Sequence, residues 1–212
     1  MQNDFKQIGN GAIIKQTILH LSDTHGLHRQ MEHLPLADVV VHSGDFCEEG
    51  TIEEVEDFVE WFASLPHKYK LFIAGNHDVC LHGAMIEGLP DGVHYLCNSG
   101  IEIDGVKFYG VPMFVADEVS GAYDTAIEKI PTDTDVLITH QPPYGILDNA
   151  EEVHYGSTSL LNQALSIKPR LHLFGHVHKA NGKTASHNTL FVNSSIVSGM
   201  KLVYKASIIT LP

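Results

Sequence analysis

The sequence predicts an α/β fold, and two observations support this prediction. Apolar runs of about four residues, each bounded by glycine or polar residues, recur along the chain, as is typical of buried strands. Amphipathic helical patterns alternate with these runs from residue 12 to about residue 175. No repeat, low-complexity tract or Pro/Gly-rich linker divides the 212 residues, so we expect one domain over residues 1–212.

Five of the apolar runs lead directly into clusters of Asp, Asn or His. The runs and the residues that follow them are 18–21 before Asp23 and His25, 39–41 before Asp45, 71–74 before Asn76, His77 and Asp78, 136–139 before His140, and 171–174 before His176 and His178. Side chains just past the carboxyl ends of such strands converge on one crevice. A single pair would also fit hydrogen-bonded structural residues, but five equivalent clusters predict a dinuclear metal site.

Three helices are predicted between the strands. Thr51 and Glu54 match a capping box, and apolar residues then recur at helical spacing until Pro66. The phenylalanine-rich stripe of this helix, which includes Phe58 and Phe62, is expected to pack in the core. The other two helices are predicted over residues 122–130 and 157–166.

The remaining strands are predicted from alternation and turn residues. Apolar residues alternate on both sides of Asp104-Gly105, a dipeptide favoured in two-residue turns, so residues 101–109 should form a hairpin. Helical patterns cease after residue 188. Residues 189–193 and 202–211 are predicted to be strands that pair antiparallel and complete a sheet.

The acidic composition limits the partners that this chain can bind. A net charge of −13 argues against a protein that grips nucleic acid by its phosphates, because such proteins present a basic surface. We therefore expect no stable nucleic-acid binding. The acidity does not exclude a small anionic substrate, since bound divalent cations can invert the local field.

Cysteine use and hydrophobicity favour a cytoplasmic protein. Cys47, Cys80 and Cys97 are odd in number and form no Cys-x-x-Cys pattern, which disfavours a disulfide framework. Residues 1–6 lack the basic and apolar regions of a signal peptide. No apolar run approaches the roughly 18 residues of a membrane span. We therefore expect a cytoplasmic location and no membrane segment.

The clustered side chains match the needs of two divalent metal ions. Such a site needs a bridging carboxylate, terminal imidazole and oxygen ligands, and an open edge for substrate. Asp45 is the candidate bridge, because it follows a strand and Gly44 allows a sharp turn there. Asn76 offers a neutral amide oxygen. The histidine-rich set suits Mn, Fe, Zn or Ni better than Mg or Ca.

Many of the 15 histidines are expected to be structural. His20 and His172 fall inside strands. His28 and His42 flank the clusters, and each either contacts the site or has a structural role. The others expected to be structural fall in turns or polar loops: His33, His67, His82, His94, His154 and His187.

The ordered motifs resemble those of calcineurin-like metallophosphoesterases. They are Asp23-x-His25, Gly44-Asp45, Gly75-Asn76-His77-Asp78, His140 and Gly175-His176-Val177-His178. Segments 42–46, 74–77 and 139–143 further resemble the compact MPPED-type branch, grouped with class III cyclic-nucleotide phosphodiesterases. The resemblance implies a four-layer α/β/β/α metallophosphoesterase sandwich of two mixed sheets flanked by helices, with the dinuclear site at one end.

The same resemblance implies a role for each site residue. The first metal would be bound by Asp23, His25, Asp45 and His178, and the second by Asp45, Asn76, His140 and His176. His77 would contact the phosphate and protonate the leaving oxygen, and Asp78 would orient the His77 imidazole. Members of the superfamily often carry Asp and Arg at the positions where this chain has Glu48 and Glu49. The missing Arg removes one contact that would serve either phosphate binding or the structure.

The predicted function is hydrolysis of small phosphodiesters, such as nucleotides or cyclic nucleotides, by a hydroxide that bridges two divalent metal ions. A phosphomonoesterase is the first alternative, since the same two-metal attack serves either ester. A non-catalytic scaffold of the same fold is the second alternative, and the complete ligand set together with His77 disfavours it. Selectivity is expected from loops at residues 46–50, 79–83, 112–120 and 144–155.

Overall fold

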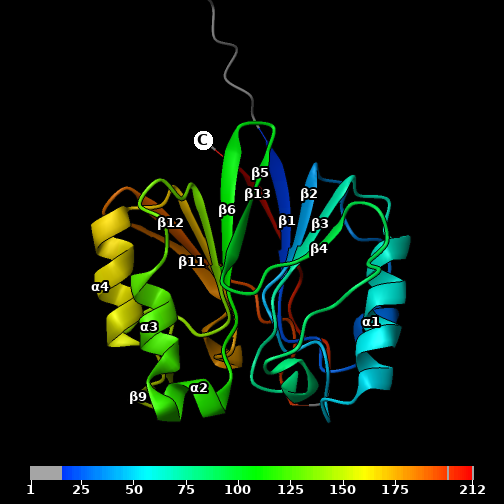
Figure 1. The fold of residues 1–212 in the computed structure, drawn as a ribbon, viewed down its shortest axis with the longest axis horizontal. Coiled ribbons are helices and arrows are strands. Elements are labelled where there is room, and N and C mark those ends of the chain that lie inside the picture. The colour runs from blue at the N-terminus through cyan, green and yellow to red at the C-terminus, as the bar shows by residue number, and fades with distance from the viewer. Residues whose placement is uncertain (1–15, 200, 212) are drawn as a thin grey trace, which may run out of the picture.

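Two β-sheets lie face to face at the centre of this protein, with helices on both outer sides (Figure 1). The computed structural model describes residues 16–199 and 201–211. The first sheet has the order β13-β1-β2-β3-β4, with strands β1 (Thr17–Leu21), β2 (Val39–His42), β3 (Tyr69–Phe72), β4 (Val93–Tyr95) and β13 (Ser207–Thr210). The second sheet has the order β11-β12-β10-β7-β6-β5, with strands β5 (Ser99–Ile103), β6 (Val106–Val111), β7 (Val136–Thr139), β10 (Leu171–Phe174), β11 (Gly182–Ser186) and β12 (Thr189–Asn193).

Both sheets are mixed. In the first sheet, β1 to β4 run parallel and β13 pairs antiparallel with β1. In the second sheet, β6, β7, β10 and β12 run parallel, while the edge strands β5 and β11 are antiparallel to their neighbours. The parallel strands of both sheets end on the lower side of the molecule in Figure 1, so the loops that follow them meet there.

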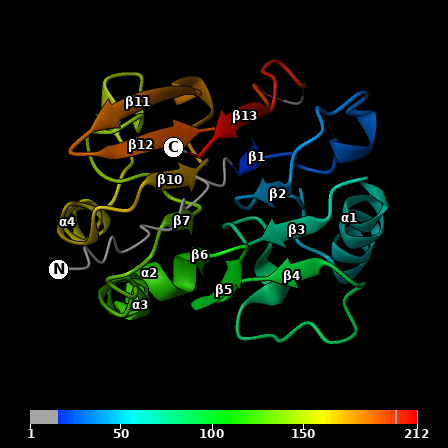
Figure 2. The same cartoon turned by 90° about the horizontal axis from the view of Figure 1, so that it is seen from above.

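Helices cover the outer faces of the two sheets (Figure 2). Helix α1 (Ile52–Ser64) packs on the first sheet, and α3 (Ala122–Glu128) and α4 (Thr158–Ile167) pack on the second. This arrangement confirms the predicted four-layer α/β/β/α sandwich. The shorter elements are α2 (Val115–Ser120), the 3₁₀ turns η1 (His28–Gln30), η2 (Val79–Leu81) and η3 (His178–Ala180), and a small hairpin of β8 (Asn149–Ala150) and β9 (Val153–His154).

Helix α1 begins where the sequence predicts, because its capping box is formed. The Thr51 hydroxyl accepts the Glu54 N–H, and the Glu54 carboxylate accepts the Thr51 N–H. The inner face of α1 is aromatic: the Phe58 ring stacks on Phe46 with a centroid distance of 4.1 Å. The phenylalanine stripe is therefore core packing, as expected.

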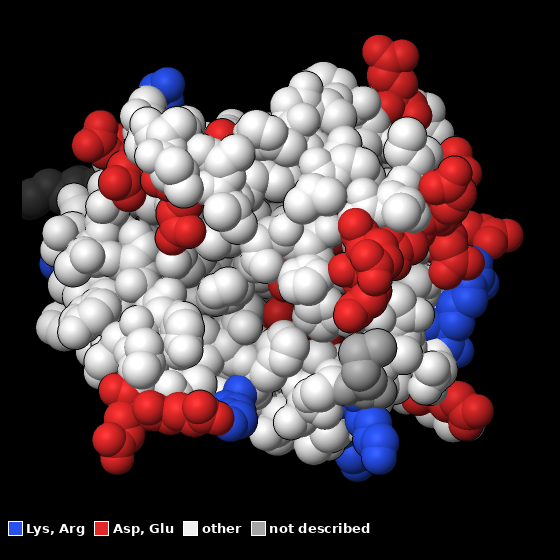
Figure 3. Space-filling view, turned by 90° about the horizontal axis from the view of Figure 1, so that it is seen from below, with Lys and Arg blue, Asp and Glu red and all other residues white. Residues whose placement is uncertain are grey.

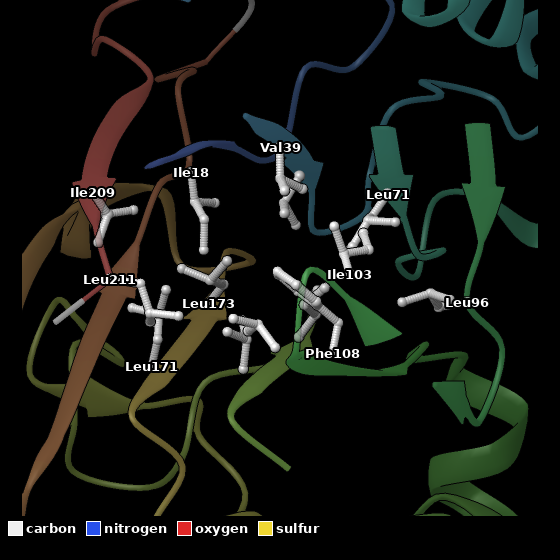
Figure 4. Close-up of a cluster of buried hydrophobic side chains, with 14 of the residues drawn as sticks. Ile18, Val39, Leu71, Leu96, Ile103, Phe108, Leu171, Leu173, Ile209 and Leu211 are labelled. Carbon is white, nitrogen blue, oxygen red and sulfur yellow. The ribbon is translucent and has the colours of Figure 1, made fainter. Parts of the chain in front are cut away.

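The core between the sheets is built from one face of each central strand (Figure 4). Ile18 of β1 points toward the second sheet, whereas Leu19 packs with the residues beneath α1. Alternate residues of a strand point to opposite faces, and both faces of these strands are covered. This double burial explains why the sequence shows continuous apolar runs instead of strict alternation.

The two C-terminal strands do not pair with each other, so that prediction is wrong. β12 lies between β10 and β11 in the second sheet, whereas β13 lies beside β1 in the first. The antiparallel partner of β12 is β11, joined to it by a turn in which His187 and Asn188 both have positive φ, as a two-residue hairpin turn requires. The residue pattern predicted that these two segments contain strands, but it carried no information about which strands they pair with.

Two further expectations concern the whole described chain. Cys47, Cys80 and Cys97 are free thiols, as predicted from their spacing. Within residues 16–199 and 201–211, none of the helices combines the length and apolar character that crossing a bilayer requires.

Candidate metal centre

The candidate site lies where the loops after the parallel strands of both sheets meet. Figure 3 looks onto this face from below and shows a recessed acidic surface near its middle, with more acidic side chains on the side of α1. The first sheet contributes residues that follow β1, β2 and β3, and the second contributes residues that follow β7 and β10. All seven predicted metal ligands come together here: Asp23, His25, Asp45, Asn76, His140, His176 and His178.

We call Asp23, His25 and His178 the outer cluster, because part of it reaches the surface. The His178 side chain is 30% exposed and that of His25 is 10% exposed. The Nε2 atoms of His25 and His178 are 3.3 Å apart, and His178 Nε2 lies 3.3 Å from Asp23 Oδ1. Three ligand atoms from two different sheets thus converge on one point.

We call Asp45, Asn76, His140 and His176 the inner cluster, because it is more deeply buried. The side chain of His140 has no exposed surface and that of Asp45 is 3% exposed. His140 Nε2 lies 3.2 Å from Asp45 Oδ2 and 3.1 Å from Asn76 Oδ1. The His140 and His176 rings meet edge to face with a centroid distance of 5.1 Å.

These spacings fit the coordination of metal ions. Two ligand atoms that bind one tetrahedral ion at about 2.1 Å are themselves about 3.4 Å apart. The ring nitrogens of His25 and His178 are 3.3 Å apart, which matches this spacing. Asp45 Oδ2 lies 3.2 Å from His140 Nε2 of the inner cluster and 3.8 Å from His25 Nε2 of the outer cluster. One carboxylate therefore faces both clusters.

Two glycines are required by the close approach of the site carboxylates. A Cβ atom on Gly75 would lie 2.2 Å from Asp45 Oδ1, and one on Gly175 would lie 2.1 Å from Asp23 Oδ2. Neither distance is compatible with a side chain. The glycines of the Gly-Asn-His-Asp and Gly-His-x-His motifs thus let the backbone pass directly over the carboxylates.

Backbone strain is concentrated among the candidate ligands. Four of the seven have positive φ values, which non-glycine residues rarely adopt: Asp23 at 57°, His25 at 41°, Asp45 at 56° and His176 at 69°. Such conformations cost about 1–3 kcal/mol each and persist only where the surrounding structure holds them. Sharp turns directly after the strands aim these side chains into the shared crevice.

In each cluster, the pKa of one imidazole is raised and that of another is lowered. Burial opposes charge on His140, but the Asp45 and Asp23 carboxylates raise its pKa to about 9, whereas burial and the charge of His140 lower the pKa of His176 to about 4. In the outer cluster, burial again opposes charge, yet hydrogen bonding to Asp23 raises the pKa of His178, while burial lowers that of His25. Each cluster therefore favours one positive charge beside its carboxylates, as a cation site does.

His77 lies beside both clusters, and its ring nitrogen Nδ1 is hydrogen-bonded to a backbone carbonyl. The His77 ring meets the His25 ring edge to face with a centroid distance of 4.6 Å, and the His77 backbone N–H donates to Asp45 Oδ1 at 2.8 Å. His77 Nδ1 lies 2.9 Å from the Glu48 carbonyl oxygen, which can only accept, so Nδ1 carries a proton. The second ring nitrogen, Nε2, is then the atom that can exchange a proton with a ligand.

Asp78 has a different contact from the one expected. Its fully buried carboxylate accepts four backbone N–H bonds, at 2.7–3.1 Å, from Asp45, Phe46, Cys47 and Gly75. Among the hydrogen bonds of the described residues, the His77 ring is held by Glu48 and not by Asp78. Burial and the neighbouring Asp45 carboxylate raise the pKa of Asp78 to about 7, against the pull of its donors. Asp78 therefore ties the turn that carries Asp45 to the turn that carries His77.

Some residues of the site were missed from the sequence. The Ser195 hydroxyl donates to Asp23 Oδ2 at 2.8 Å, and the Asn193 amide donates to the carbonyl oxygens of Gly175 and Val177. Both residues come at the end of β12, the same kind of position as the predicted clusters. The sequence does show a polar segment at the end of this strand, residues 193–195, but the segment contains neither His nor Asp and therefore did not indicate a metal ligand. Glu48 was noted only for its departure from the family pattern, and its carbonyl is what holds His77.

The flanking histidines are structural in this arrangement. His42 Nε2 lies 3.1 Å from the Thr24 hydroxyl, and the ring packs against Phe58 at 5.0 Å. His28 bonds to Asp57 of α1 at 2.9 Å. Inside the strands, His20 lies 2.9 Å from the Ser43 hydroxyl. None of the three belongs to the metal-ligand groups found among the described residues.

Known proteins share sequence similarity with this chain over most of its length. A UPF0046 protein of Caenorhabditis elegans is 35% identical over 205 residues, which cover 84% of this chain and 69% of the relative. Metallophosphoesterase domain-containing protein 1 of Homo sapiens is 33% identical over 211 residues, which cover 83% of this chain and 64% of that protein. The chain thus spans about two thirds of the length of these relatives.

The fold also matches a solved structure. The crystal structure of TT1561 of Thermus thermophilus superposes with a TM-score of 0.57 at 13% identity, covering 85% of this chain and 89% of that chain. At this identity the likeness concerns the fold alone. The family model of the calcineurin-like phosphoesterases matches residues 16–180, which include all the candidate metal ligands. This chain therefore belongs to the calcineurin-like phosphoesterase family.

Proposed function

We propose that this protein hydrolyses small phosphodiesters at two divalent metal ions. The first ion would be held by Asp23, His25, Asp45 and His178, and the second by Asp45, Asn76, His140 and His176. The observation that carries this proposal is the position of Asp45, whose Oδ2 atom faces imidazoles of both clusters. A carboxylate shared in this way is what a two-metal site needs as its bridge.

The donor set also suits particular metals. Four imidazoles, two carboxylates and one amide oxygen favour Mn, Fe, Zn or Ni over Mg and Ca, which prefer oxygen ligands. When bound, such ions supply Lewis acidity toward phosphate oxygens and lower the pKa of bound water. Four of the ligands are presented by turns with positive φ values, which aim their side chains into the shared crevice.

His77 is proposed as the general acid. Its Nδ1 proton is held by the Glu48 carbonyl, which fixes the plane of the ring and leaves Nε2 directed away from that bond. A proton on Nε2 can then pass to the ester oxygen that leaves. Asp78 supports this role indirectly, because its carboxylate accepts backbone N–H groups from both the turn that carries Asp45 and the turn that carries His77.

A diester is the favoured substrate because cations are scarce around the site. The chain has only two arginines, and both are paired elsewhere: Arg29 with Asp57 and Glu60, and Arg170 with Asp135. Lys179, next to His178, pairs with Glu151. A phosphomonoester dianion would gain little from such surroundings, and the −13 net charge disfavours it relative to a monoanionic diester.

The test is a comparison of bis-p-nitrophenyl phosphate with p-nitrophenyl phosphate, each assayed with Mn, Ni, Zn and Mg. We expect the diester to have the larger kcat/KM at neutral pH and low salt, and added salt to narrow the gap. A monoester preference at both salt concentrations would replace the diesterase with the phosphomonoesterase alternative. No turnover of either ester with any metal would favour the scaffold alternative.

A further inference from the structure

A cavity of about 340 Å³ adjoins the outer cluster on the side of the β8–β9 hairpin. His176 and His178 form one part of its wall together with the intervening Val177, and Tyr155 and Ala150 form another part. Because candidate metal ligands line it directly, a group bonded to a phosphate at the metal centre could extend into this cavity.

Tyr155 is presented to the cavity by a firmly held backbone. Its N–H donates to the Asp148 carbonyl at 3.0 Å, and its own carbonyl accepts from the Gln141 side chain at 3.1 Å. Asp148 is buried, and its carboxylate accepts the N–H groups of Gly145 and Gly156. Gln141 directly follows the candidate ligand His140. Tyr155 nevertheless remains 48% exposed, so an aromatic side chain lines the cavity beside the candidate ligands His176 and His178.

The charges that line this cavity are already paired. Lys179 and Glu151 form an ion pair that joins η3 to the β8–β9 turn across the cavity wall. The rest of the lining is apolar or aromatic, apart from the two candidate ligands. A second phosphate group would find no unpaired cation among these lining residues, whereas an uncharged planar group would find an aromatic face.

We infer that this cavity binds a planar aromatic ester group of the substrate, such as a nucleobase, by stacking on Tyr155. The inference rests on the proposed phosphodiesterase function, because the phosphate must sit at the metal centre for the group to reach the cavity. Stacking of a base on an aromatic side chain contributes about 1–3 kcal/mol, which corresponds to roughly 5- to 150-fold in affinity. Tyr155 is a binding residue in this arrangement and takes no part in bond breaking.

The experiment compares two ligands that differ only in the base. Binding of thymidine 5′-monophosphate and of 1,2-dideoxyribose 5-phosphate, in which hydrogen replaces the base, to the Mn²⁺-loaded protein is measured by calorimetry, with release of inorganic phosphate followed in parallel. We expect the thymine base to strengthen binding by at least about fivefold. Tyr155→Ala should reduce this ratio to about one, whereas Tyr155→Phe should retain it.

Tyr144→Ala is the matched control. Tyr144 belongs to the same loop and is 45% exposed, but it packs against His154 and does not line the cavity. A base effect that survives in Tyr155→Ala, or that disappears equally in Tyr144→Ala, overturns the inference. Equal binding of both ligands by the wild type also overturns it while leaving the phosphate site intact. If neither ligand binds while bis-p-nitrophenyl phosphate is still hydrolysed, the inference fails and the proposed function stands; if the diester is not hydrolysed either, both fail.

Discussion

His140 and His172 are equally buried and belong to neighbouring strand segments of the second sheet, yet their pKa values move in opposite directions. His140 directly follows β7, and His172 lies within the adjacent strand β10. Burial opposes charge on both, but Asp45 and Asp23 raise the pKa of His140 to about 9, while nothing offsets burial at His172, whose pKa falls to about 3. His172 Nε2 lies 2.9 Å from the neutral hydroxyl of Thr139, and its ring packs against Phe174 and Phe191.

The same contrast separates the site from the strand interiors in general. His42 is buried next to Phe58, and burial lowers its pKa to about 3 even though Asp23 lies near enough to oppose the shift. Burial likewise holds the pKa of His20 well below its ordinary value. Burial alone therefore produces a neutral structural histidine. A buried histidine becomes part of a cation site only where carboxylates converge on it, which happens past the ends of the strands.

Removing the Asp45 carboxylate should have the largest effect on the difference between the site histidines and the structural histidines. In Asp45→Ala, the inner cluster loses its only carboxylate and both clusters lose the proposed bridge, so we expect loss of at least one metal equivalent and of all measurable turnover. Elemental analysis of the purified protein and assays with bis-p-nitrophenyl phosphate test this. Two retained equivalents with full turnover would show that Asp45 is not the bridge. Asp45→Asn, which keeps the shape, separates loss of charge from loss of packing.

A second large effect is expected at His77, which lies beside the clusters without being a proposed ligand. His77→Ala should lower kcat by roughly 10²–10⁴ while metal content stays unchanged. The loss should be smaller for p-nitrophenyl esters, because their leaving group needs little protonation. Exposed His82 provides the control, and His82→Ala should leave kcat nearly unchanged. Equal losses with good and poor leaving groups would leave His77 as a residue that only positions the phosphate.

The raised pKa of His140 predicts how metal binding depends on pH. Below about pH 9 a metal ion must displace the His140 proton, so the apparent affinity of the inner cluster should fall by up to about tenfold for each pH unit. Competitive titration of Zn²⁺ with a chelator of known pH dependence, between pH 6 and 8, measures this slope, and proton release can be measured in the same titration. Metal binding with no proton release at pH 7 would contradict the charged state of the clusters.

The smallest effect concerns His172 and stability in acid. Its pKa is lowered from 6.5 to about 3 on folding, so below pH 6.5 this imidazole binds a proton in the unfolded chain but not in the folded protein. Stability is therefore lost progressively as the pH falls from 6.5 toward 3, at about 1.4 kcal/mol per pH unit. In His172→Gln, the loss between pH 7.5 and 5.5 should shrink by about 1.4 kcal/mol.

Urea unfolding at the two pH values, with a chelator present, measures this difference. The control is His82→Gln, because His82 is exposed and hydrogen-bonded at the surface to Asp117. The acid sensitivity of this control should resemble that of the wild type. An unchanged loss in His172→Gln would place the acid-sensitive group elsewhere.

Local sequence patterns predicted the elements more reliably than their partners. The helix after Thr51 and the hairpin around Asp104 formed as predicted, because a capping box and a turn dipeptide act over a few residues. The assignment of residues 189–193 and 202–211 to a single pair failed, because pairing is chosen among all strands that the fold brings together. The exposed strand β11 was missed because its residues 182–186 are mostly polar or small.

The sequence by itself determined the family, the four-layer fold and the residues that gather at the site. The family and the fold follow from the resemblance of the ordered motifs, and the gathering of the site residues follows from five strand ends with Asp, Asn and His, since the ends of parallel strands meet at one crevice. Only the tertiary structure decided the contacts between residues of different loops: that Glu48 holds His77, that Asp78 binds four backbone N–H groups, and that Ser195 supports Asp23. A backbone carbonyl or N–H is common to every residue, so its use leaves no mark on the amino-acid sequence.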